Sequence, residues 1–168
     1  MKLSIVDQSP IPAGSTAADA LNNSIDLARH AEALGYHRYW LAEHHATESF
    51  AGSAPEIMIA RVAAETSSIR VGSGAVLLPH YAPLKVVEQF RVLHALYPDR
   101  IDLGIGRAPG GSGLDAYALR RQRANEVMTD DFGQQLPELL AFLHGLFPEK
   151  HAFSNVHVSP AMPGAPEV

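Results

Sequence analysis

Short apolar runs alternate along the chain with longer segments in which apolar residues recur at helical spacing. The runs cover residues 3–6, 39–42, 70–78 and 101–105, and their length and their β-branched or aromatic content predict strands. They begin roughly 30 residues apart, with one predicted helix between each pair, which is the pattern of βαβ units. Because such crossovers are right-handed, the strands are predicted to form a parallel sheet.

The first predicted helix carries a signal at each end. Thr16 and Asp19 resemble a capping box in which Asp takes the place of the usual Glu, and Gly35 marks the end of the helix. Between them, one apolar stripe is predicted to be buried, consisting of Leu21, Ile25, Ala28, Ala31 and Leu34.

Three more helices are predicted further along the chain. Residues 53–56 form a helix start with a proline in the first turn. The buried stripe of this second helix is predicted to be Ile57, Ala60 and Ala64, and that of the third to be Val86, Phe90 and Leu93. A last helix is predicted over residues 130–146. These elements divide the chain into a β/α region, residues 1–146, and a Pro-rich extended tail, residues 147–168.

Two architectures fit four β/α units. One is an open, doubly wound sheet, and the other is part of a closed barrel. A closed (β/α)₈ barrel normally needs about 250 residues and eight strands. The chain has 168 residues, so it could hold only about half of such a barrel.

Composition narrows the functional classes. The net charge is −5 with both signs mixed along the chain, which argues against a nucleic-acid partner because phosphate binding needs a basic surface. Cysteine is absent, which excludes disulfides and thiolate metal sites. Without a long apolar run or a signal-peptide core, the chain is expected to be cytoplasmic and not to contact a membrane.

Unusual polar residues and glycines follow the predicted strands. In a parallel α/β fold, ligands bind at the carboxyl ends of the strands. The residues found there are Asp7 and Gln8, then Glu43, His44 and His45, then Gly74 and Ala75, and finally Gly106 and Arg107. Their common position at one end of the sheet predicts a single site.

The Glu43-His44-His45 segment has three interpretations. Histidine titrates near neutrality, so one of the pair could transfer a proton or bind beside a cofactor. The residues could instead be satisfied polar groups at a strand end. A metal site is disfavoured, since neighbouring strand residues point to opposite faces and both histidines could not easily bind one ion.

The glycines of the third and fourth strands also leave alternatives open. Gly74 and Ala75 could present their backbone to a flat ligand, or Gly74 could serve a tight packing contact. The segment 104–113 does not have the spacing of a dinucleotide fingerprint. Arg107 is the better candidate for a phosphate contact, although it could also be a solvated surface residue. Trp40 is assigned to the core.

Three of these segments, residues 39–45, 70–79 and 97–107, resemble the bacterial-luciferase-like flavin monooxygenase family. They occur in the family's order and at its separations. The resemblance runs from residue 1 to the end of the chain and covers the family's N-terminal half. It implies an α/β fold of the (β/α)₈ TIM-barrel type, of which this chain holds the first four β/α units, with the tail leading into a fifth strand.

The resemblance also implies a chemistry. In the family, reduced FMN supplied by a separate flavin reductase reacts with oxygen and oxidises a small organic substrate, and FMN is favoured here over a deazaflavin. His44 takes the catalytic position. The cofactor-binding positions are Glu43, His45, Gly74, Ala75, Gly106 and Arg107. Among them, Gly74–Ala75 corresponds to a non-prolyl cis peptide that supports the flavin ring, and Arg107 to a residue that contacts the flavin phosphate. Luciferases proper can carry cysteine at the position of Gly106, so light emission is not expected.

Three functions therefore stay open. The chain could be a flavin-dependent monooxygenase or the retained half of one. It could be a non-enzymatic, oligomerising half barrel from a truncated or degenerate member, which would associate through the bare edges of its first and fourth strands. It could also be a dinucleotide-binding α/β domain. Whether this chain is itself an enzyme is left open.

Overall fold

Four parallel strands form one sheet within residues 1–108, 112–119 and 131–168, which the computed structural model describes. The strands are hydrogen-bonded in sequence order: β1 (Ser4–Asp7), β2 (Arg38–Leu41), β3 (Arg70–Leu77) and β4 (Ile101–Gly106). The helices are α1 (Ala17–Ala33), α2 (Pro55–Ala64), the short 3₁₀ helix η1 (Leu78–His80), α3 (Pro83–Leu96), α4 (Gly113–Leu119) and α5 (Phe132–His144). The predicted βαβ succession and the parallel sheet are confirmed.

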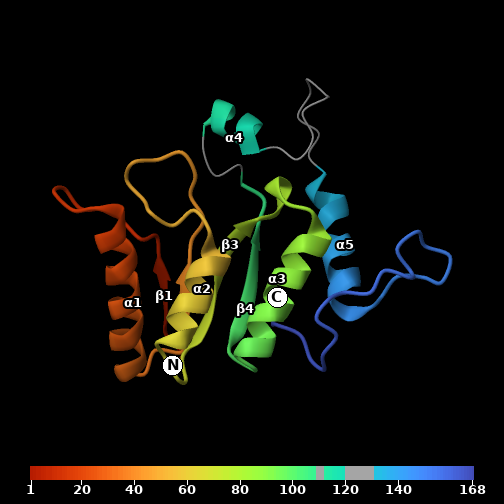
Figure 1. Ribbon diagram of the computed structural model, residues 1–168, viewed down its shortest axis with the longest axis horizontal. Helices are drawn as coiled ribbons and strands as arrows, with labels where there is room; N and C mark the ends of the chain where they lie inside the picture. The colour runs from red at the N-terminus through yellow and green to blue at the C-terminus, as the bar shows by residue number, and fades with distance from the viewer. Residues whose placement is uncertain (109–111, 120–130) are drawn as a thin grey trace.

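The strand order decides between the two architectures. A doubly wound sheet reverses its order at a switch point and carries helices on both faces, whereas this sheet runs β1-β2-β3-β4 without reversal. Helices α1, α2 and α3 lie on the same side of the sheet (Figure 1). Successive addition of strands with all helices outside is the arrangement of a (β/α)₈ barrel, and the chain has four units of it.

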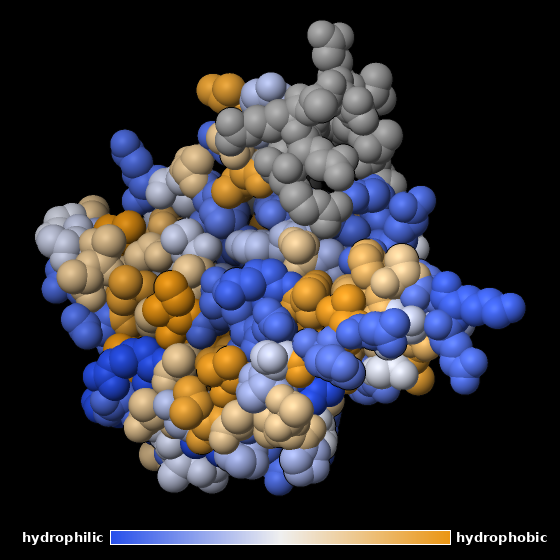
Figure 2. All heavy atoms as spheres, turned by 45° about the vertical axis from the view of Figure 1, so that its right-hand side comes forward, coloured by the Kyte–Doolittle hydropathy of each residue, from blue (hydrophilic) through white to orange (hydrophobic). Residues whose placement is uncertain are grey.

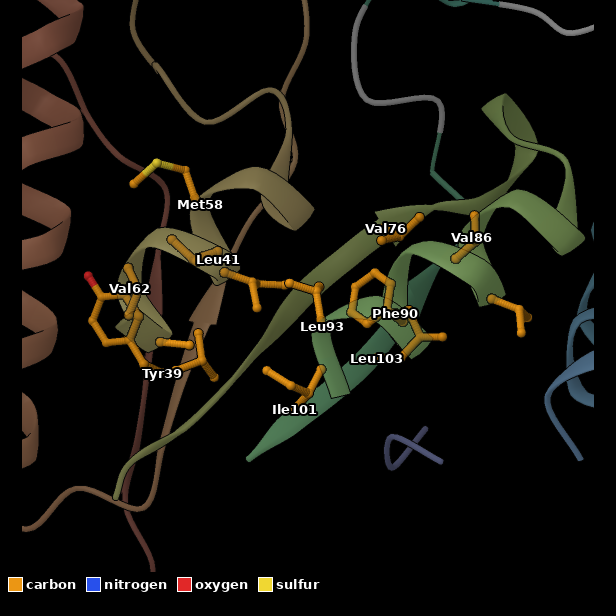
Figure 3. Close-up of a cluster of buried hydrophobic side chains, with 14 of the residues drawn as sticks. Tyr39, Leu41, Met58, Val62, Val76, Val86, Phe90, Leu93, Ile101 and Leu103 are labelled. Atoms are coloured by element: carbon orange, nitrogen blue, oxygen red, sulfur yellow. The ribbon is translucent and has the colours of Figure 1, made fainter. Parts of the chain in front are cut away.

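The core lies between the sheet and these helices. Tyr39, Leu41 and Leu103 point from the strands toward side chains of α2 and α3, which include Val62 and Phe90 (Figure 3). All five are almost completely buried. The predicted stripe of α3 is confirmed, since Val86, Phe90 and Leu93 are all buried.

The predicted buried face of α2 was wrong. Ile57 is 66% exposed, and the buried residues of the helix are Pro55, Met58, Ile59, Val62 and Ala63. Both sets of residues satisfy a spacing of three and four, so the period alone does not say which face meets the sheet. A similar error occurs at the end of α1, where the capping box of Thr16 and Asp19 is confirmed but Leu34 is 76% exposed. Leu34 is the residue that ends the helix, and the chain turns there.

Helix α4 was not predicted. It begins after Ser112, whose amide and hydroxyl both donate to the carboxylate of Asp115, at 3.0 and 2.6 Å. The pair follows the capping-box spacing, which could have revealed the helix. The last predicted helix is confirmed as α5, within narrower limits, while residue 130 lies outside the described residues.

The Pro-rich tail ends alongside β4. Glu167 forms a parallel bridge with Asp102, and the amide of Leu103 donates to the Glu167 carbonyl at 2.7 Å. The Glu167 side chain belongs to a charged cluster on the face of the sheet away from the helices. There, Arg38 and Arg70 both donate to the Asp102 carboxylate and lie close to that of Glu167. The tail thus reaches the position and direction expected of a fifth strand.

Glu32, on α1, holds the loop that leads into β3. Its carboxylate accepts the backbone amides of Ser67, Ser68 and Ile69 at 2.9, 2.6 and 2.9 Å. Burial opposes ionisation, but the amides of Ile69, Ser68 and Ser67 outweigh it and lower the Glu32 pKa from its usual 4.5 to about 2. The ionised carboxylate therefore stabilises the fold at neutral pH, and this contribution is lost as the pH falls from about 4.5 toward 2.

Replacing Glu32 with Gln should lower the free energy of unfolding at pH 7 by roughly 1–2 kcal/mol, after allowance for solvent screening. The difference from the parent protein should shrink as the pH falls below about 4.5. Urea unfolding followed by circular dichroism at several pH values measures both effects. Glu149→Gln, at an exposed position, is the control and should change little. A difference that stays constant down to pH 2 would contradict the assignment.

Candidate functional site

The predicted site residues come together at the carboxyl edge of the sheet. Because the strands are parallel, Asp7, Leu41, Leu77 and Gly106 end them at the same side. In Figure 1 this edge faces upward, toward α4. The strand ends therefore share one edge, as a parallel sheet requires, while a single site formed by the residues that follow them stays a prediction.

Glu43 is the centre of a hydrogen-bonded cluster at this edge. Its side chain is fully buried. One carboxylate oxygen accepts the Leu77 amide at 2.9 Å, and the other accepts the Tyr81 hydroxyl at 2.7 Å and lies 2.6 Å from Nε2 of His45. Burial and the bond to Glu43 raise the pKa of Tyr81, so its hydroxyl remains a donor. The cluster joins the end of β2 to the end of β3.

Sequence reasoning missed Tyr81. It lies in the Pro-flanked segment 79–83, which has no periodicity to indicate burial. Its backbone carbonyl accepts the side-chain amide of Gln135 at 3.3 Å, so the same residue also contacts α5. Nothing in the local sequence indicates a partner more than fifty positions away.

The two histidines have different surroundings. The ring of His45 is bonded to Glu43 and packs edge-on against His80, with 5.9 Å between the ring centroids. The ring of His44 lies 4.7 Å from that of Phe50, and its Nδ1 is buried without a hydrogen-bond partner among the described residues. Within that part of the chain, no group of three or more His, Asp or Glu residues could hold a metal ion.

The peptide bond between Gly74 and Ala75 is cis, as the resemblance implied. A Cβ atom on Gly74 would lie only 2.8 Å from the Cβ of Trp40. A Cβ on Gly72 would lie 2.7 Å from the Trp40 ring. The glycines thus make room for this side chain. Trp40 was assigned to the core, but it is partly exposed and lies on the face away from the helices, because Tyr39 and Leu41 occupy the helix side.

Gly106 is the last residue of β4 and lies next to the cis peptide, and Arg107 follows it. A Cβ atom on Gly106 would lie 3.1 Å from the Leu77 side chain and 3.4 Å from the Cβ of Ala75. The small residues 75 and 106 therefore lie side by side. Arg107 follows them and is exposed. Positions 109–111 of the glycine-rich segment are outside the described residues.

The Asp7 side chain lies on the helix side of the sheet and does not belong to this site. Its buried carboxylate accepts the Ser9 amide at 2.8 Å and the Tyr39 hydroxyl at 2.7 Å. Burial and the bond to Asp7 raise the pKa of Tyr39. The cluster fixes the turn after β1, where Ser9 has a positive φ of 50°. The neighbouring Gln8 is exposed.

Comparison with known proteins matches this geometry to one family. The sequence pattern described as luciferase-like monooxygenase matches residues 1–165. The chain belongs to the luciferase-like monooxygenase family. An N-acetyl-S-alkylcysteine monooxygenase of Bacillus subtilis is 45% identical over the whole chain and 50% of its own length.

Solved structures of the family share the fold. The crystal structure of apo-MsnO8 is 54% identical, with a TM-score of 0.87 over 98% of this chain and 48% of that one. The oxygenating constituent of 3,6-diketocamphane monooxygenase from a Pseudomonas putida plasmid was solved in complex with FMN. It is 25% identical, with a TM-score of 0.70 over 83% of this chain and 38% of that one. The chain spans about half the length of the curated relatives it matches.

Membership of the luciferase-like monooxygenase family argues against the dinucleotide-binding alternative. That alternative needed a doubly wound sheet with a switch point, and the family's barrel and the observed strand order both lack one. None of the described helices is long and apolar enough to cross a membrane.

Gly104 has the least room for a side chain among the described glycines, and it tests how closely β3 and β4 pack. A Cβ atom there would lie 2.1 Å from the Ser73 carbonyl oxygen. Gly104→Ala should force β3 and β4 apart and lower the free energy of unfolding by about 3 kcal/mol, as measured by urea denaturation. Gly133→Ala, in α5, is the control because a Cβ there meets nothing within 4 Å. Equal effects of the two substitutions would refute the close contact.

Proposed function

We propose that this chain forms one half of the active site of a flavin-dependent monooxygenase, in which reduced FMN and oxygen oxidise an organic substrate. The observation that carries the proposal is the position of the cis Gly74–Ala75 peptide, His44 and Arg107 at one edge of a parallel sheet. Family membership and the FMN-bound relative support the choice of cofactor.

The residues at this edge fit FMN in three respects. Ala75 and the neighbouring Gly106 offer a surface of small residues to a flat ring. Exposed Arg107 can pair with a phosphate through its guanidinium. His44 has a buried Nδ1 without a partner among the described residues, so its ring is not committed to another side chain there. These residues would hold the cofactor and handle protons beside it.

In this proposal, bound reduced FMN supplies the electrons that activate oxygen, one atom of which enters the substrate while the other leaves as water. A separate reductase restores the reduced cofactor. The chain's own residues would hold the flavin ring against Ala75 and Gly106, bind its phosphate through Arg107, and exchange a proton at the His44 ring.

Arg107→Ala tests the cofactor assignment. We expect weak FMN binding by this chain alone, because the relatives bring about twice its length to the fold. The substitution should weaken FMN binding about tenfold, the worth of a charge-assisted phosphate contact, and should leave riboflavin binding nearly unchanged. Fluorescence-quenching titration with both flavins measures this, with Arg61→Ala on α2 as the control. Equal losses for FMN and riboflavin would remove Arg107 from the phosphate role.

Self-association is a second candidate function, favoured by the bare edge of β1. The edge of β4 was also expected to be bare, but Glu167 of the tail pairs with it at Asp102. Among the described residues, no strand pairs with the outer side of β1. Val6, a residue of this strand, is 61% exposed. Exposed strand edges commonly pair with another chain. Figure 2 shows apolar and hydrophilic residues interspersed on the face in view.

We therefore expect the chain to form dimers or larger species at micromolar concentration. Light scattering coupled to size exclusion should report a mass above that of one chain. Val6→Lys should shift the distribution toward monomer by placing a charge beside the edge, while Leu34→Lys, at a position 76% exposed on the far end of α1, should not. A monomeric mass for the parent protein would rule out this function.

A further inference from the structure

The two adjacent histidines of the site differ in how firmly they are held. The His45 ring is bonded through Nε2 to a fully buried carboxylate, that of Glu43, and only 13% of its side chain is exposed. The His44 ring contacts Phe50, and no described side chain forms a hydrogen bond with its Nδ1. The structure therefore separates a ring held by a buried carboxylate from a ring whose buried Nδ1 has no hydrogen-bond partner among the described residues.

The fixation of His45 originates in Glu43. An ionised carboxylate has lone pairs and no proton, so every group bonded to it must donate. The Leu77 amide fills one oxygen, and the Tyr81 hydroxyl shares the other with His45. The described residues provide no Lys or Arg partner for Glu43, so these donors are what satisfies the buried carboxylate.

We infer that Glu43 and Tyr81 are positioning residues that hold His45 as the Nε2–H tautomer, leaving its Nδ1 as the acceptor nitrogen of the neutral ring. The Tyr81 hydroxyl donates to the same carboxylate oxygen that lies next to His45 Nε2. Tyr81 is held in turn, because its carbonyl accepts the Gln135 amide of α5. The orientation of His45 thus depends on α5, an element remote in the sequence.

The assignment has a chemical consequence for whatever binds at this edge. A ligand group that reaches the open side of His45 meets an acceptor, so it must present an N–H or O–H. This consequence rests on the proposed function, because it supposes that the edge binds a cofactor or substrate. The tautomer itself does not, since it follows from the chain's own contacts.

The test is nitrogen NMR of the imidazole rings in the flavin-free protein at alkaline pH, where histidine is neutral. The chain has nine histidines, and His45→Gln identifies which signals belong to His45. We expect Nε2 of His45 to give the protonated type of signal and Nδ1 the unprotonated type. The reverse pattern in the parent protein would overturn the inference.

Glu43→Gln provides a sharper test. If the Gln carbonyl accepts the Leu77 amide, the NH₂ group must face His45 and Tyr81, and His45 can then only accept at Nε2. The two nitrogen signals of His45 should exchange character. Retention of the Nε2–H pattern would show that Glu43 does not set the tautomer.

Tyr81→Phe removes the donor that shares a Glu43 oxygen with His45, so the Nε2–H pattern should remain while the His45 nitrogen signals shift. Its matched control is Tyr97→Phe, which removes a hydroxyl bonded to the Ala60 carbonyl at 3.2 Å, at the opposite end of α3 from Tyr81. His45 signals that are the same in both variants would remove Tyr81 from the positioning role. Because no flavin is present, a failed FMN titration would leave this result intact, and a wrong tautomer would leave the FMN proposal intact.

Discussion

The carboxylate of Glu43 is completely enclosed by protein, and the carboxyl edge of the sheet is organised around satisfying it. Leaving a buried charge without partners costs several kcal/mol, so the end of β3, the Tyr81 hydroxyl and the His45 ring must all reach it. This requirement fixes the path of the chain after two neighbouring strands. The cis peptide of Gly74–Ala75 lies just before Leu77 and belongs to the same constrained stretch.

A second buried carboxylate, that of Asp102, also holds neighbouring strands together, nearer their amino ends. Asp102 is almost completely buried on the inner face of the sheet, which is the face away from the helices. Arg38 and Arg70 contact it there from β2 and β3. Here the partners are cations, and the bond to Asp102 raises the pKa of Arg70. Trp40 fills the space that Gly72 and Gly74 leave open on this face. The inner face is therefore built from charge pairing, one aromatic ring and hydrogen bonds, while the outer face is an apolar core.

How much of this the sequence predicts depends on the range of the interaction. Alternating apolar runs and the Thr16 cap are local or periodic signals, and they predicted the β/α succession correctly. The choice of part of a barrel over a doubly wound sheet came from the resemblance and agrees with the observed strand order. The positions of Glu43, His44 and Arg107 followed from the rule that parallel strands end at one edge. The face of α2 was wrong because two stripes fit the same period. The role of Tyr81 and the inner position of Trp40 depend on contacts between distant segments, which no local pattern contains.

The simple strand order also bears on how the molecule is made. Each strand from β2 to β4 pairs with the one before it, through contacts such as Ser4 with Arg38, Arg38 with Arg70, and Val71 with Ile101. These partners are separated by only about 30 residues, and folding is faster when contacting residues are close in the chain. Each new strand meets an edge that is already complete when it leaves the ribosome. For the four described strands, the topology therefore favours assembly in the order of synthesis.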